Sequence, residues 1–163
     1  METQKTYLYE YHKSLGAKFV PFAGYEMPVQ YVGLMKEHQQ VRSAVGVFDV
    51  SHMGEVRVRG PKAADALMWL LSNAIRRIEI GQAQYNVMCN PAGGVVDDVV
   101  VYRMGADEFV VCVNAANRAK DFAWMVENNP YPEGADFTDE SDEWGQLAIQ
   151  GPVAEAVIQQ MTD

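Results

Sequence analysis

The sequence has few of the residues from which metal and redox sites are built. It contains two cysteines, Cys89 and Cys112, and three histidines, His12, His38 and His52. There is no CxxC motif, and no histidine stands at ligand spacing from another histidine or from a cysteine, so a metal site is not expected. Both cysteines lie in apolar, strand-like runs, and we interpret them as buried free thiols of a cytosolic protein.

Long apolar segments are also missing. No run approaches the roughly 20 residues of a membrane-spanning helix, and the chain does not open with the basic and apolar regions of a secretory signal. With 163 residues, of which 48% are hydrophobic, the chain can still bury a sizeable core. We therefore expect a cytoplasmic protein without a membrane partner. The mitochondrial matrix would be the expected location only if the source were eukaryotic, and no transit peptide is seen.

Basic residues are absent from the last part of the chain. From Asp121 onward there are ten acidic residues and no lysine or arginine, whereas residues 1–120 carry twelve acidic and thirteen basic residues. The net charge of −9 therefore belongs to the C-terminal segment. We interpret its acidic run, 136–143, as a solvated loop. Because no basic stripe exists to neutralise phosphates, a nucleic-acid partner is not expected.

Hydrophobic periodicity and turn residues predict an α+β fold with mainly antiparallel sheets and packed helices. Residues 18–26, interrupted by Pro21 and Gly24, are expected to be irregular. Helices are predicted at 6–15, 33–44, 62–73, 115–128 and from Gly151-Pro152 to the end; strands are predicted at 46–50, 55–59, 108–114 and 144–150, with a hairpin at 85–102.

The predicted hairpin is the most informative segment, because its second strand contains two adjacent acids, Asp97 and Asp98. Neighbouring strand residues point to opposite faces, so the two carboxylates must have different surroundings. A buried carboxylate needs a partner or a ligand; alternatively, both acids only support the turn. Asn114 is likewise either an N-cap of the next helix or an amide that recognises a planar heterocycle.

Other polar and aromatic side chains are less specific. Asp49, Ser51 and His52 lie close together in the sequence, but no nucleophile elbow surrounds them, so a hydrolase triad is not expected. Tyrosine and methionine side chains near the hairpin are either core residues or ligand contacts.

Several segments, taken in order along the chain, resemble the glycine-cleavage T-protein family, the aminomethyltransferases. These segments are 15–31, 37–42, 48–55, 94–98, 113–117 and 147–152. The family fold is a cloverleaf of three domains around a folate-binding hole. The resemblance implies that this chain is its N-terminal portion, with about 1–50 and 144–163 in one lobe, about 51–143 in a ferredoxin-like lobe, and the later domains absent.

The resemblance also implies a reaction: transfer of an aminomethyl carbon from lipoylated H-protein to tetrahydrofolate, with release of ammonia. It implies that Asp98 is the catalytic residue and points inward while Asp97 points outward. The folate site would be lined by Met53, Tyr85, Asp98, Tyr102, Val113 and Asn114, with no metal. The expected partners are folate and the H-protein, and the last helix, left uncovered, suggests self-association or a missing C-terminal half.

Two alternatives remain at this point. One is another folate-dependent one-carbon enzyme, such as a dimethylsulfoniopropionate demethylase or the folate domain of a sarcosine- or dimethylglycine-oxidising enzyme. The other is a non-catalytic folate-binding or interaction module. The segments 49–55 and Asp98 fit the T-protein pattern better than that of the other one-carbon enzymes.

Overall fold

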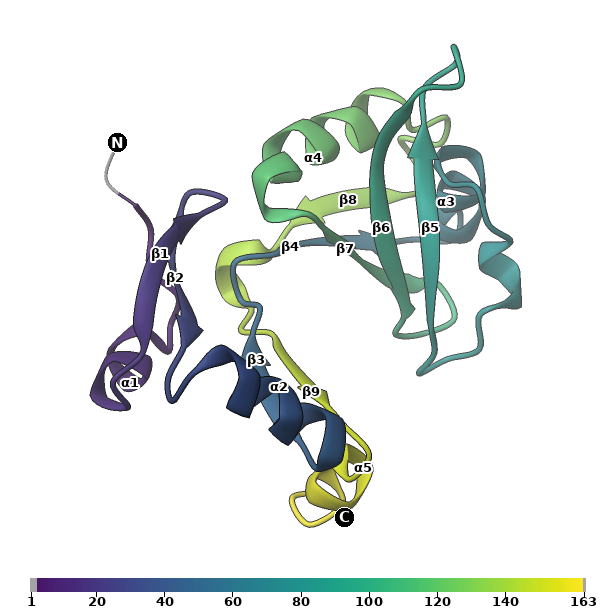
Figure 1. Cartoon of the computed structure of the whole chain (residues 1–163). Helices are drawn as coiled ribbons and strands as arrows, with labels where there is room; N and C mark the ends of the chain where they lie inside the picture. Colours follow the sequence, from purple (N-terminus) through teal and green to yellow (C-terminus); the bar gives the residue numbers. More distant parts are fainter. Residues whose placement is uncertain (1–2, 163) are drawn as a thin grey trace. The chain divides into compact units, whose positions relative to one another are not determined.

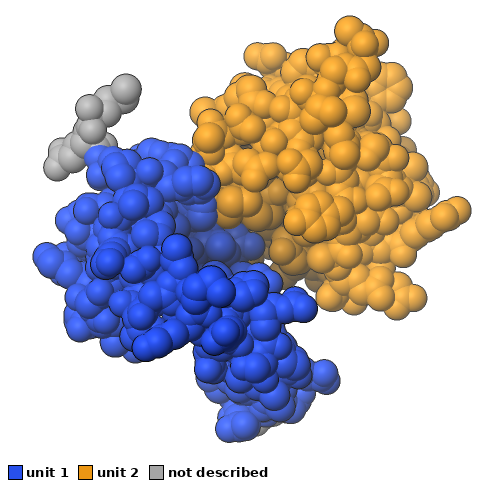
Figure 2. Space-filling model, viewed as in Figure 1, with its two compact units in different colours: residues 1–52, 145–163 blue, residues 53–144 orange. Residues whose placement is uncertain are grey.

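The structure is a computed structural model that describes residues 3–162 (Figure 1). Its contacts divide the chain into two compact units: unit 1 lies within residues 1–52 and 145–163, and unit 2 is residues 53–144 (Figure 2). Both units combine helices with antiparallel strands, which confirms the predicted α+β class. The two lobes expected as domains stay a prediction, since compactness does not test independent folding. Within residues 3–162, no helix has the length and apolarity to cross a membrane.

Unit 1 consists of two short strand pairs with three helices. Its elements are α1 (Tyr9–Ser14), β1 (Lys18–Phe22), β2 (Tyr25–Gln30), α2 (Leu34–Ser43), β3 (Gly46–Asp49), β9 (Leu147–Gln150) and α5 (Ala154–Ile158). β1 pairs with β2, and β3 pairs with β9, both antiparallel. The Glu37 carboxylate accepts three backbone N–H groups, from Tyr31, Val32 and Gly33 at 2.7–2.9 Å, and so fixes the start of α2.

The expectation of an irregular segment at 18–26 is wrong, because these residues belong to the β1–β2 hairpin. Pro21 is compatible with a strand here because this sheet has only two strands, so each strand has a free edge. The turn takes Ala23 and Gly24 at positive φ, a conformation that glycine adopts at no steric cost.

Unit 2 is built on one five-stranded antiparallel sheet with strand order β5-β6-β7-β4-β8. Its elements are β4 (Gly54–Arg59), α3 (Ala63–Leu70), the 3₁₀ turn η1 (Ile75–Arg77), β5 (Ala83–Cys89), β6 (Val95–Arg103), β7 (Glu108–Val113), η2 (Ala115–Asn117), α4 (Arg118–Glu127), β8 (Asp136–Asp139) and η3 (Ser141–Glu143). The predicted hairpin is confirmed as β5 and β6. Without β5, the order is that of a βαββαβ sheet.

The hydrophobic core of unit 2 lies between this sheet and the helices α3 and α4; α3 is seen behind β5 in Figure 1. Leu67 of α3 and Met125 of α4 are fully buried there, with alternate residues of the strands such as Val99, Val101 and Phe109. Since strand side chains alternate, the residues between these point to the other face of the sheet. We call that other face the helix-free face.

The acidic run at 136–143 is not the solvated loop that its composition predicts. Its first residues form the edge strand β8, which pairs with β4. Several of its carboxylates have arginine partners: Arg57 Nε donates to Glu140 at 2.9 Å, and Arg118 Nε donates to Asp139 at 3.0 Å. These arginines lie on β4 and α4, so the local composition could not show them.

Two smaller expectations also need correction. Cys112 is buried, as predicted, but Cys89 is exposed at the end of β5, next to the hairpin turn. The last helix, α5, spans only Ala154–Ile158 and does not continue to the end of the described chain.

The buried side of α3 should stabilise unit 2 more than its exposed side. Leu67→Ala should lower the free energy of unfolding by about 2–5 kcal/mol, because it leaves a cavity in the core. Trp69→Ala, at an exposed position of the same helix, should change it by about 0.5 kcal/mol or less. Urea unfolding of both variants measures the difference; equal losses would contradict the assignment of this core.

Candidate functional site

The helix-free face of unit 2 carries three cross-strand rows of side chains. The register of β5 through β8 defines them. The rows are Val87 and Asp98; then Tyr85, Val100, Cys112 and Glu55; then Ala83, Tyr102, Val110, Arg57 and Thr138. Neighbouring residues in one row have Cβ atoms about 4.5–5.5 Å apart, so a planar ligand lying over the rows would touch several strands at once.

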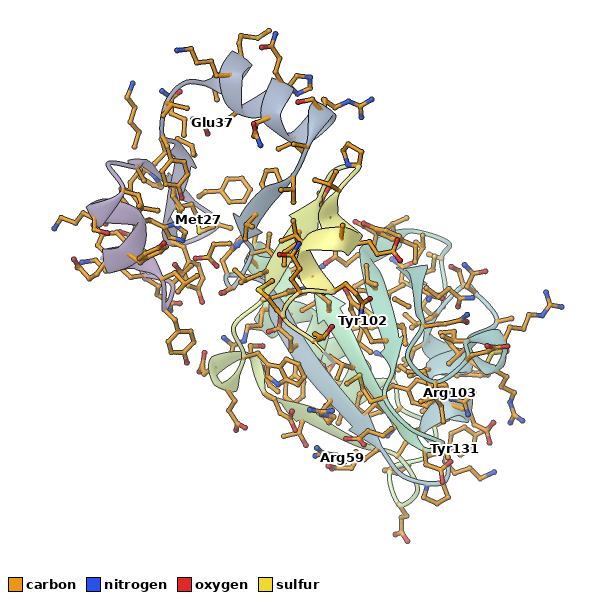
Figure 3. All side chains as sticks on the ribbon, turned by 90° about the horizontal axis from the view of Figure 1, so that it is seen from below. Met27, Glu37, Arg59, Tyr102, Arg103 and Tyr131 are labelled. Atoms are coloured by element: carbon orange, nitrogen blue, oxygen red, sulfur yellow. The ribbon has the colours of Figure 1, made fainter. Side chains whose placement is uncertain are left out.

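The structure brings five of the six predicted folate-site residues to this region. Tyr85, Asp98 and Tyr102 point to the helix-free face, and Tyr102 is labelled on β6 in Figure 3. Asn114 directly follows β7, and Met53 directly precedes β4. Gly54 pairs with Val113, so the antiparallel register, continued by one residue, places Met53 opposite Asn114. These five residues are far apart in sequence, and the sheet register is what joins them.

Val113 is the exception. Its side chain is fully buried among the core residues on the helix side of the sheet. Only its backbone is available to a ligand on the helix-free face.

The expected orientation of the two adjacent acids is wrong. Asp97 is the buried carboxylate, on the side of α4, whereas Asp98 is exposed on the helix-free face. The reason is the alternation of β6, in which Asp97 shares a face with the core residues Val99 and Val101. Asp98 nevertheless remains the acid that a ligand on the helix-free face would meet.

Asn114 joins the two acids. Its side-chain Nδ2 donates to Asp97 Oδ1 at 3.0 Å and to the backbone carbonyl of Asp98 at 3.1 Å, and lies 3.4 Å from Asp98 Oδ1. Asn114 makes no side-chain cap to the following turn. The N-cap interpretation is therefore wrong, and the amide instead fixes the backbone beside Asp98.

A second buried carboxyl group lies under this arrangement. Asp121, in the first turn of α4, is fully buried, and burial together with the hydrogen bond to Asp97 raises its pKa to about 7. Burial alone would raise the pKa of Asp97 as well, but hydrogen bonds with Asp121, Asn114 and Asn117 outweigh it, so this pKa lies below its usual value. No sequence pattern marks this pair, because Asp121 appears in the sequence only as one acid of a predicted helix.

Glu55 is a further ionisable residue on the helix-free face. It is buried, and Oε1 has no hydrogen-bond partner among residues 3–162. Burial raises its pKa to about 7, with Arg118 acting in the opposite direction. The alternation of polar and apolar residues in β4 places Glu55 on the helix-free face. A polar residue in such a pattern is expected to be exposed, so the burial of Glu55 could not be predicted from the sequence.

The polar residues at the end of β3 do not form a hydrolase triad. Asp49 binds His12, with Oδ2 and Nε2 3.0 Å apart, and accepts the backbone N–H of Ser51. The His52 ring instead packs against Phe22 and Tyr25. The structure thus agrees with the absence of this motif.

The helix-free face combines an exposed carboxylate, two tyrosines and a fixed amide. Such a surface can stack against a planar ring and orient a ligand N–H toward the carboxylate. No cluster of three or more His, Cys, Asp or Glu side chains suited to a metal ion occurs in the described part of the chain.

Comparison with known proteins decides the family. The family model described as GCVT N-terminal domain matches residues 8–163. The chain belongs to this family. An aminomethyltransferase of Bdellovibrio bacteriovorus is 57% identical over 152 residues, covering 93% of this chain and 41% of the relative. Aminomethyltransferases of Listeria monocytogenes and Desulfitobacterium hafniense are 48% and 50% identical, each covering 99% of this chain and 44% of the relative.

The solved structure of the glycine cleavage system aminomethyltransferase T from Bartonella henselae has the same fold. It superposes with a TM-score of 0.88 and 37% sequence identity, covering 96% of this chain and 43% of that chain. The resemblance to the T-protein family is therefore confirmed. The chain spans somewhat over two fifths of the length of the relatives it matches.

Asp121 should make the stability of the chain depend on pH. A folded pKa of about 7, against about 4 in the unfolded chain, gives stability that is complete below pH 4 and is lost as pH rises through 7. Asp121→Asn should remove this dependence, which amounts to at most about 1.4 kcal/mol per pH unit for one proton. Urea unfolding of both proteins from pH 5 to 8 measures it.

The informative quantity is the difference in unfolding free energy between the wild type and Asp121→Asn at each pH. Glu55 also has a raised pKa, whereas burial lowers the pKa of His52, which makes it act in the opposite direction; both contributions are common to the two proteins. Asp107→Asn, at an exposed turn, serves as the matched control. A difference between wild type and Asp121→Asn that is constant over this range would show that Asp121 does not hold its proton in the folded chain.

Proposed function

We propose that this chain provides the tetrahydrofolate-binding face and the catalytic aspartate of a glycine-cleavage aminomethyltransferase. The observation that carries the proposal is the position of Asp98, an exposed carboxylate on a face that also presents Tyr85 and Tyr102. Its support is membership of a family whose relatives at 48–57% identity are named aminomethyltransferases. No observation favours another folate-dependent reaction or a non-catalytic module.

The proposed reaction moves one carbon atom. The aminomethyl group, held as a thioether-like adduct on the lipoyl arm of the H-protein, loses its bonds to sulfur and to nitrogen. The carbon becomes bonded to two nitrogens of tetrahydrofolate, giving 5,10-methylenetetrahydrofolate. The two protons that these nitrogens lose complete the thiol of the lipoyl arm and the released ammonia, so the step needs no oxidant, reductant or metal.

Asp98 would orient the folate nitrogens and take part in moving their protons. A carboxylate can accept a hydrogen bond from a ligand N–H, and a positioned acid–base group typically contributes 10²–10⁴-fold to a rate. Asn114 holds the Asp98 backbone at 3.1 Å, so the carboxylate starts from a fixed Cα position. Tyr85, which is 71% exposed, would gain burial when an aromatic ring covers it.

Folate and the lipoylated H-protein are the proposed partners, and the cytoplasm is the proposed location.

Calorimetry of the intact chain with tetrahydrofolate tests the binding part of the proposal. We expect heat of binding from the wild type and weaker binding from Asp98→Asn, which keeps the shape of the side chain but changes its charge and its accepting groups. Asp107→Asn makes the same chemical change at an exposed turn and should bind like the wild type. Binding that is unaffected by Asp98→Asn would argue against a contact between Asp98 and folate.

Turnover needs a separate assay with aminomethylated H-protein, using the chain alone and the chain joined to the remaining segments of the Bdellovibrio relative. Asp98→Asn should lower kcat/KM by about 10²–10⁴-fold, measured as methylenetetrahydrofolate formed. An unchanged rate would remove Asp98 from the mechanism, and an equal loss in Asp107→Asn would indicate a nonspecific effect of charge.

A further inference from the structure

Asp97 and Asp121 are buried carboxyl groups to which the proposed reaction gives no role, and three of their four oxygen atoms lack a hydrogen-bond donor. Asp97 Oδ2 and both Asp121 oxygens are buried, and when both carboxyl groups are ionised no residue that the structure describes donates a well-aligned hydrogen bond to them. Buried polar atoms are normally paired, so an unpaired cluster of this kind calls for an explanation.

The charge of a neighbouring lysine does not explain this cluster. Lys120 lies beside the pair: its Nζ is 3.1 Å from Asp121 Oδ1 and also donates to the carbonyl of Val96. Its side chain is half exposed, whereas Asp121 is fully buried. If Asp97 and Asp121 were both ionised, two buried negative charges would repel each other, with only the partly solvated Lys120 ammonium beside them. Such an arrangement is energetically costly.

A single shared proton removes the difficulty. When Asp121 is protonated, its O–H can donate to Asp97, and the pair carries one negative charge. The pKa values of the two groups shift in opposite directions, Asp121 upward through burial and Asp97 downward through its hydrogen bonds despite burial, as expected when one proton stays between two carboxyl groups.

The pair is connected to the proposed catalytic residue. Asp97 Oδ1 accepts the Asn114 amide at 3.0 Å, and the same Nδ2 donates to the Asp98 backbone at 3.1 Å. The four residues come from β6, from the end of β7 and from α4, so their contacts join three elements. Asp121 does not reach the helix-free face, and any effect that it has on a ligand must pass through Asp97 and Asn114.

We propose that Asp97 and Asp121 form a proton-sharing carboxyl pair, and that Asp121 is a positioning residue which acts through Asp97 and Asn114 to hold Asp98 for folate. The positioning role rests on the proposed function, whereas the shared proton does not. Loss of the proton places a second charge beside Asp97 and removes its donor, which loosens the hold of Asn114 on the Asp98 backbone. The charged groups that act on Asp121 are Asp97 from β6 and Lys120 from α4.

The shared proton is tested on the intact chain without any ligand. Carboxyl ¹³C chemical shifts of aspartate-labelled protein should show a group titrating near pH 7 that is absent in Asp121→Asn. The apparent pKa values belong to the pair, so assignment uses the variant rather than the wild-type curve alone. If all aspartates titrate below pH 5 in the wild type, the pair shares no proton and the proposal is overturned.

The positioning role is tested by the affinity for tetrahydrofolate between pH 5.5 and 8.5. The affinity of the wild type should fall as pH rises through about 7, and Asp107→Asn, which keeps the carboxyl pair, should fall in the same way. Asp121→Asn shows the ligand's own pH dependence. Asp121→Asn has an N–H donor for Asp97 at every pH, so it should bind as well as the wild type does at low pH and lose the extra fall. Asp121→Leu, which has no donor, should bind about tenfold more weakly throughout, as for the loss of one buried hydrogen bond.

The outcomes separate the two proposals. If Asp121→Asn and the wild type show the same pH profile, Asp121 does not act as a positioning residue, although the proposed function stands. If no protein binds tetrahydrofolate while the carboxyl titration near pH 7 is present, the proposed function fails and the positioning role fails with it. If Asp121→Leu does not fold, the comparison between the wild type and Asp121→Asn decides alone.

Discussion

The alternation of side chains along β6 is the constraint on which the candidate site depends. It separates two adjacent acids by the thickness of the sheet, placing Asp97 under α4 and Asp98 on the helix-free face. A shift of one residue in the pairing of β6 would exchange the two acids and would also expose Val99 and Val101. The hydrophobic core and the candidate site are therefore fixed by the same register, so one cannot change without the other.

Asn114 connects the two separated acids, because its side-chain amide, at the end of the neighbouring strand, donates both to the Asp97 carboxylate and to the Asp98 backbone carbonyl. It links the buried side of the sheet, where protonation of Asp121 matters, to the side where a ligand would bind. The site is thus supported by a rigid sheet and by hydrogen bonds from below, an arrangement that keeps a binding group in a fixed position.

The sequence predicted much of the fold because many of its signals are local. The predicted helix at 33–44, strand at 55–59 and hairpin at 85–102 each depend on residues within one segment, and all are present, as α2, β4 and β5–β6. The misassigned segments depend on distant partners. The β1–β2 hairpin was missed because Pro21 and Gly24 suggested a break. β8 was missed because Arg57 and Arg118, which bind its acids and those beside it, lie elsewhere in the sequence.

The candidate site shows the same limit. Alternation required Asp97 and Asp98 to point to opposite faces, but it could not say which face the helices cover, and the orientation was predicted the wrong way round. The burial of Glu55 and Asp121 is set by contacts between elements, so no local pattern marks these residues. The family resemblance nevertheless supplied Asp98, because it compares motifs in order and does not depend on knowing the faces.

The central claim is that folate binds on the helix-free face of unit 2, and the most direct measurement is an amide ¹H–¹⁵N titration of the chain with tetrahydrofolate. Binding on this face predicts saturable shifts at Tyr85, Asp98, Tyr102 and Asn114, in the strands and loop that border it, with little change in α1 or α5. Shifts confined to unit 1, or no shifts at saturating ligand, would contradict it.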